Sequence, residues 1–149
     1  MTASKYTNIS DYFTHLTLPN SNIGGHAICP FLKKYLDSIK YTTHTSKIDV
    51  YQSIPKIVAD NLPAHVIVCD FEWDWYEMDS VVHALHHLYQ SQDMEFLFMH
   101  PESEDPALPI IKYAYYKPLI IVQVRSMLQQ ARQQLAQNTD YYTYFSRAK

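Results

Sequence analysis

The sequence predicts a small α+β domain, in which a mixed sheet of about four strands carries helices packed on it as a two-layer sandwich. Two observations lead to this fold class. Segments with apolar residues at helical spacing alternate with short β-branched and aromatic segments along the chain. The length of 149 residues is close to the commonest size of a single domain. Since no repeat or linker is visible, we expect one domain over residues 1–149, with 138–149 an aromatic C-terminal tail.

The first half of the chain contains two helices, a loop and a strand. Apolar residues at helical spacing predict a short helix over residues 9–18. Turn-forming residues make 19–29 a loop, and Pro30 then opens one or two helical turns. β-branched and aromatic residues favour a strand over 39–45. A longer amphipathic helix over 49–62 follows.

The second half continues the alternation. The short apolar run 65–71 is bounded by proline and acidic residues, which predicts a buried strand. Residues 75–90 carry the clearest amphipathic stripe and predict a helix. Strand 94–99 and the proline-broken loop 102–109 come next. Two strand segments and a polar amphipathic helix complete the chain: residues 110–116, 119–124 and 126–137. With so few strands, a two-layer arrangement resembling ferredoxin-like folds is expected rather than a doubly wound sheet.

Composition and charge exclude several classes of function. The chain has only two glycines, Gly24 and Gly25, so it contains neither a P-loop nor a dinucleotide fingerprint, and no nucleotide cofactor is expected. The net charge of -3 gives no reason to expect a nucleic-acid partner. The apolar run 119–122 is far shorter than the roughly 20 residues that cross a bilayer. We therefore expect a soluble, cytoplasmic protein without a membrane partner.

The first candidate site surrounds Cys29, which precedes the helical turns that Pro30 opens. A helix N-terminus stabilises a thiolate, and His26 would add positive charge. The pair could form a nucleophile, a redox-sensitive thiol or half of a metal site. The alternative is a proline-capped turn that anchors Phe31 in the core. Cys69 ends an apolar strand and is interpreted as a small buried hydrophobe.

The second candidate site is a possible site for a divalent metal ion on the helix 75–90. Asp79, His83 and His87 follow one another in steps of four, which brings three potential ligands onto one face. The surrounding sequence lacks the glutamate of a His-Glu-x-x-His zinc hydrolase. A solvated polar face explains the same three residues.

The third candidate is His100, which follows the strand 94–99 and precedes an acidic loop. Ligand sites tend to form in loops beyond strand ends, and a histidine there can act as a general base or metal ligand. Equally, His100 could cap the strand by hydrogen bonding to backbone. Tyr113 and Tyr115 share one face of a predicted strand and could line an aromatic pocket.

Three short motifs resemble those of a bacterial family of unknown function, whose members are small α/β proteins. The motifs are Cys29-Pro30-Phe31, His100-Pro101 and Lys117-Pro118-Leu119. The resemblance implies that Cys29, His100 and His26 converge on one pocket. It implies no reaction, because the family's activity is not established.

Two functions are consistent with these features. The first is a small-molecule or metal site, catalytic or not, built from Cys29, His26 and His100. The second is a non-catalytic accessory module that uses an aromatic surface and its C-terminal tail to form a homodimer or contact a protein partner. The sequence predicts no substrate for the first function and no particular partner for the second.

Overall fold

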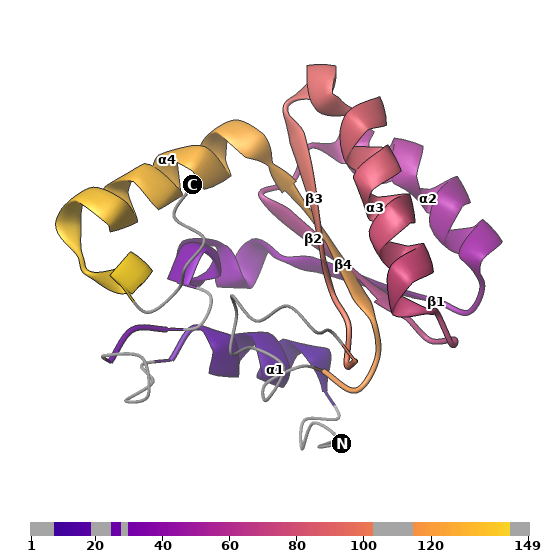
Figure 1. Ribbon diagram of the computed structural model, residues 1–149, viewed down its shortest axis with the longest axis horizontal. Helices are drawn as coiled ribbons and strands as arrows, with labels where there is room; N and C mark the ends of the chain where they lie inside the picture. Colours follow the sequence, from indigo (N-terminus) through magenta and orange to yellow (C-terminus); the bar gives the residue numbers. More distant parts are fainter. Residues whose placement is uncertain (1–7, 19–24, 28–29, 103–114, 144–149) are drawn as a thin grey trace.

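The computed structural model describes residues 8–18, 25–27, 30–102 and 115–143. Helices and strands alternate along the described chain, and one antiparallel pair of strands follows near the end (Figure 1). The elements are α1 (Ile9–Leu16), the 3₁₀ helix η2 (Pro30–Ser38), β1 (Lys40–His44), α2 (Lys47–Asp60), β2 (Ala64–Cys69), α3 (Trp75–Leu88), η3 (Gln90–Gln92), β3 (Met94–Met99), β4 (Leu119–Val124), α4 (Arg125–Asn138) and η5 (Tyr141–Thr143).

The four strands form one mixed sheet in the order β1-β2-β4-β3. β1 and β2 are parallel, whereas β4 is antiparallel to both β2 and β3. All six residues of β2 and all six of β4 are buried, as expected for central strands that are covered on both faces. The predicted fold class, α+β with helices packed on a small mixed sheet, is confirmed.

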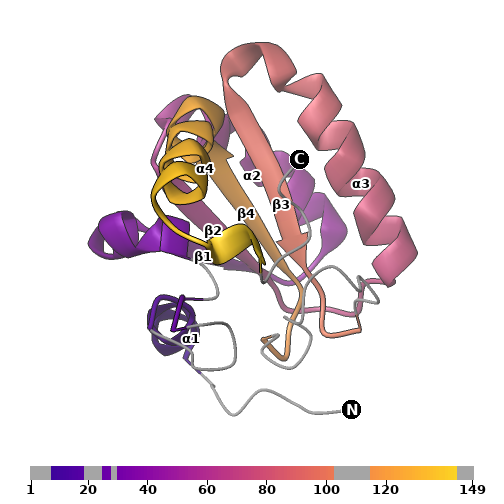
Figure 2. The same ribbon diagram turned by 60° about the vertical axis from the view of Figure 1, so that its left-hand side comes forward.

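Helices cover both faces of the sheet (Figures 1 and 2). Ala64, Val66 and Val68 of β2 pack in one apolar core with α1 and η2, and α4 lies on the same side. Ile67 and Cys69 face the other way, into a second core formed with α2 and α3. The structure therefore has three layers where the sequence predicted two. The reason is that β2 and β4 are apolar on both faces, and each face has to be covered.

The order of the elements that build and cover the sheet from β1 onward is β-α-β-α-β-β-α. In the sheet, β4 lies between β2 and β3. The resemblance to a ferredoxin-like fold stays a prediction. The described residues contain no helix with both the length and the apolar character that crossing a membrane requires.

Most observed elements lie within a few residues of the predicted ones. The helix predicted over 49–62 begins two residues earlier, directly after Ser46, whose side chain caps it. The strand predicted over 110–116 falls largely outside the described residues. Its last two residues, Tyr115 and Tyr116, belong to no strand.

Two non-glycine residues adopt the left-handed backbone conformation that glycine usually supplies. Asn61 follows α2 with φ 51°, and Asp93 precedes β3 with φ 57°. Asparagine and aspartate tolerate this conformation better than other residues with side chains. Asp93 Oδ1 also accepts a hydrogen bond from Ser126 N–H (3.0 Å) in the first turn of α4. These two residues show how a chain with few glycines makes its sharp turns.

Candidate functional site

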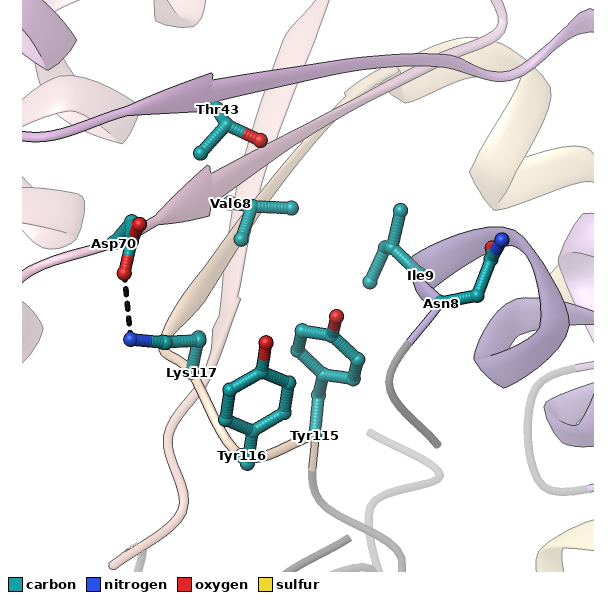
Figure 3. Close-up of a pocket in the computed structure, with 8 residues that line it drawn as sticks. All are labelled: Asn8, Ile9, Thr43, Val68, Asp70, Tyr115, Tyr116 and Lys117. Carbon is teal, nitrogen blue, oxygen red and sulfur yellow. Dashed lines mark hydrogen bonds and ion pairs between the residues drawn. The ribbon is translucent and has the colours of Figure 1, made fainter. Parts of the chain in front are cut away.

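A pocket of about 340 Å³ opens where β1 and β2 end (Figure 3). This volume is near the lower end of the range found for small-molecule sites. The pocket also lies beyond the carboxyl ends of two parallel strands, which is where ligands bind in open α/β sheets. Eight described residues line it: Asn8, Ile9, Thr43, Val68, Asp70, Tyr115, Tyr116 and Lys117.

The backbone fixes one wall of the pocket. Asp70 N–H donates to the carbonyl of His44 (2.8 Å), which extends the pairing of β1 with β2 by one residue. Cys69 N–H donates to the carbonyl of Pro118 (2.9 Å), which holds the start of β4 beside the end of β2. Asp70 and Lys117 therefore face each other although they are far apart in sequence.

An ion pair joins these two residues across the pocket wall. Lys117 Nζ lies 2.5 Å from Asp70 Oδ1, and both side chains are partly exposed. The hydrogen bond to Asp70 raises the pKa of Lys117 above its usual value. Lys117 Nζ also lies 5.4 Å from the centroid of the Tyr116 ring, within the range of a cation–π interaction. The pocket thus contains one positive and one negative charge, held side by side.

Tyr115 and Tyr116 form a second wall, with ring centroids 4.7 Å apart. Tyr115 is buried, with 4% of its surface exposed, and Tyr116 is 44% exposed. Burial and a hydrogen bond with Tyr116 raise the pKa of Tyr115 to about 12. Its hydroxyl therefore keeps its proton at neutral pH and can donate a hydrogen bond. In Figure 3 both hydroxyls point into the space between β2 and the start of α1.

The start of α1 closes the pocket on the remaining side. Asn8 caps the helix, since its Oδ1 accepts hydrogen bonds from the N–H groups of Ser10 (2.8 Å) and Asp11 (3.3 Å). The Tyr12 ring lies 5.3 Å from the Tyr115 ring, centroid to centroid. The position of α1 on the sheet therefore determines the shape of the pocket.

Cys29 and Tyr113, both singled out by the sequence, lie outside the described residues. His26 is described, and its Nε2 lies 2.5 Å from Asp140 Oδ1. Its ring also packs edge-on against Tyr141, with centroids 5.7 Å apart. The hydrogen bond from His26 lowers the pKa of Asp140. His26 thus connects the N-terminal third of the chain to the segment that follows α4.

His100 uses both ring nitrogens to hold the backbone at the end of β3. It is buried, with 6% of its surface exposed. Its Nε2–H donates to the carbonyl of Trp73 (2.6 Å), and its Nδ1 accepts from Glu102 N–H (3.0 Å). This geometry matches the alternative stated for His100 above, in which it caps the strand by hydrogen bonding to backbone. The two histidines contact different cores. Trp73, the partner of His100, belongs to the core with α2 and α3, whereas Tyr141, beside His26, belongs to the opposite core. Neither histidine lines the pocket.

Replacing His100 with alanine is expected to lower the free energy of unfolding by about 1–3 kcal/mol, because the buried carbonyl of Trp73 loses its donor. Urea denaturation measures the change. His83→Ala is the control, because His83 is exposed on α3 and its removal should leave stability within about 0.5 kcal/mol of the original. Equal midpoints for the His100→Ala variant and the original protein would contradict the structural role.

Asp79, His83 and His87 are all exposed on α3. Asp79 and His87 are eight residues apart, about 12 Å along a helix axis. In the part of the chain that the structure describes, no three His, Cys, Asp or Glu side chains are grouped to hold a metal ion. A metal bound by fewer of these residues stays a prediction.

Asp70, Tyr116 and Asn8 are pocket residues that the sequence did not indicate, and Lys117 was indicated only by the resemblance. One signal could have found Asp70. It is the first carboxylate after the short apolar run 66–69, and such positions lie at the carboxyl edge of a sheet. No comparable local signal marks Asn8 or Tyr116, because α1 and β4 bring them to this edge from opposite ends of the chain.

No protein-family model, curated protein or solved structure matches this chain. The resemblance to a bacterial family stays a prediction. The function is therefore argued from the site itself, because a fold alone does not determine function.

Proposed function

We propose that the protein binds a small polar molecule of no net charge, such as a free amino acid, in the pocket between α1 and the ends of β1 and β2. The observation that carries this proposal is the Lys117–Asp70 ion pair on the wall of a pocket of about 340 Å³. A ligand with a single charge would meet one like-charged group there, which is unfavourable. A zwitterion can place its carboxylate near Lys117 and its ammonium near Asp70.

The aromatic residues support the same class of ligand. The Tyr116 ring face already lies near one cation, Lys117, and could attract a ligand ammonium in the same way. The Tyr115 and Tyr116 hydroxyls can donate hydrogen bonds to a carboxylate. Val68 and Ile9 supply an apolar surface for the remainder of the ligand.

A binding role is favoured over catalysis by the state of the polar groups. Asp70 is paired with Lys117, and Tyr115 is hydrogen-bonded to Tyr116. The pKa values of Tyr115 and Lys117 are both shifted away from neutrality, whereas a general acid or base works best with a pKa near the working pH. A reactive Cys29 is a separate proposal, and the rate of thiol alkylation tests it.

Lys117→Met should weaken binding of the preferred amino acid by about tenfold or more, because the carboxylate loses a charged hydrogen-bond donor. Isothermal titration with a panel of free amino acids measures the affinity. Compounds that have the side chain of the preferred amino acid but only its carboxylate or only its ammonium group should bind more weakly than the amino acid itself.

Lys56→Met is the matched control, because Lys56 forms an exposed ion pair with Asp60 within α2 (3.4 Å) and does not line the pocket. Its affinity for the ligand should equal that of the original protein. The proposal fails if no amino acid binds, or if the two lysine variants bind equally well.

A further inference from the structure

The first turns of α2 and α3 lie side by side and are joined by their side chains. Lys47 Nζ lies 2.5 Å from Glu77 Oε2. The same Glu77 oxygen accepts a hydrogen bond from Trp73 Nε1–H (3.2 Å). The Tyr51 ring packs against the Trp73 ring, with centroids 6.3 Å apart. These contacts create a continuous surface at one end of the two helices.

Large apolar side chains are exposed on this surface. Ile48 is 60% exposed, Tyr76 is 65% exposed, and Tyr51 is also exposed. The Trp75 ring packs edge to face against Tyr76, at 4.7 Å between centroids. Clustered exposed apolar residues are typical of interaction sites, whereas single ones need no explanation.

Several carboxylates belong to the same segments of the chain as these apolar residues. The segment 72–79 contains four carboxylates and no lysine or arginine. Glu72, Asp74 and Asp79 are exposed, and so is Asp49 at the start of α2. The nearby cation Lys47 is already paired with Glu77. We call Ile48, Tyr51, Glu72, Tyr76 and Asp79 the acidic aromatic surface.

We propose that the acidic aromatic surface docks a basic segment of another protein, one that carries arginine and lysine side chains. Carboxylates attract these cations, and a guanidinium stacks on a tyrosine ring. The aliphatic stems of arginine and lysine can cover Ile48. Charge complementarity of this kind selects partners and accelerates their encounter.

A second copy of this chain is a poorer occupant. The chain carries a net charge of -3, and two acidic aromatic surfaces facing each other would repel. The surface shares no residue with the pocket at Asp70. Ligand binding and partner docking can therefore be tested separately.

The two tryptophans of the chain provide the readout. Trp73 is buried against Tyr51, and Trp75 contacts Tyr76, so tryptophan fluorescence reports on this surface. The full-length protein is titrated with a peptide of alternating arginine and leucine and, separately, with one of alternating glutamate and leucine. We expect the arginine peptide to bind more tightly, with an affinity that falls as salt is added.

Two variants of the surface and one control locate the binding. Tyr76→Ser should weaken binding of the arginine peptide by about fivefold or more, and Asp79→Lys should weaken it further at low salt. Leu88→Ser is the matched control, because Leu88 is 68% exposed at the other end of α3, and its affinity should be unchanged.

Three outcomes would overturn the proposal. The first is equal binding of the arginine and glutamate peptides. The second is a loss of affinity in Leu88→Ser as large as that in Tyr76→Ser. The third is concentration-dependent self-association in light scattering that Tyr76→Ser abolishes, which would assign the surface to a second copy of the chain.

Discussion

Replacing Phe13 with alanine is expected to lower the free energy of unfolding by about 3–5 kcal/mol. Phe13 is fully buried in α1, edge-on to Tyr12 and close to the Tyr41 ring of β1 (5.9 Å between centroids). Its removal leaves a cavity between α1 and the sheet. A loss of this size is a large part of the stability of an ordinary domain, and urea denaturation measures it.

The same change should also impair the pocket, because α1 carries Ile9 and its cap Asn8. Ile54→Ala is the matched control. Ile54 is equally buried, but it lies in α2 in the core on the opposite face, and its loss should cost about 2–5 kcal/mol. Under conditions where both variants remain folded, only Phe13→Ala should weaken ligand binding. Equal affinities would show that α1 does not organise the pocket.

Acidification from pH 6.5 to about 4 is expected to remove up to about 3 kcal/mol of stability through His65 alone. His65 is buried in β2, and its Nε2 lies 2.9 Å from Thr42 Oγ1. Burial, together with the charges of Lys40 and His44, lowers the pKa of His65 to about 4, and the charge of Asp60 opposes them.

The sign follows from proton binding. The unfolded chain takes up a proton at this residue below about pH 6.5, whereas the folded protein does so only near the pKa of about 4. The contribution of His65 to the free energy of unfolding is therefore fully present above pH 6.5 and is lost as the pH falls towards 4.

Urea denaturation as a function of pH tests this with two variants. His65→Gln should remove the part of the pH dependence that belongs to His65, and the exposed His83→Gln should keep the original curve. If His65→Gln loses as much stability on acidification as the original protein does, the effect belongs to the carboxylates instead.

Local signals predicted most of the described helices and strands correctly. Ser46 and Asp74 cap α2 and α3, and each cap precedes an apolar stripe that the sequence displays directly. The layering could be predicted only in part. A strand buried on both faces indicates that both faces are covered, but the pattern does not reveal which helices cover which face.

The candidate site was predicted less well than the fold, because it depends on contacts between distant segments. Tyr115 was singled out as able to line an aromatic pocket, and it lines the pocket at Asp70 from a loop rather than a strand. Asp70 meets Lys117 only because β4 pairs with β2. His100 could be assigned to strand capping only once Trp73 was seen to lie against it.

The central position of β4 has a consequence for biosynthesis. β2 pairs on one side with β1, which precedes it closely, and on the other side with a strand that is translated about 50 to 60 residues later. Among the described strands, β3 pairs only with β4. A nascent chain that has just emerged through β3 therefore exposes two apolar strands with unpaired edges, a state prone to aggregate. Completion of β4 pairs the open edge of β2 and one edge of β3 in one step.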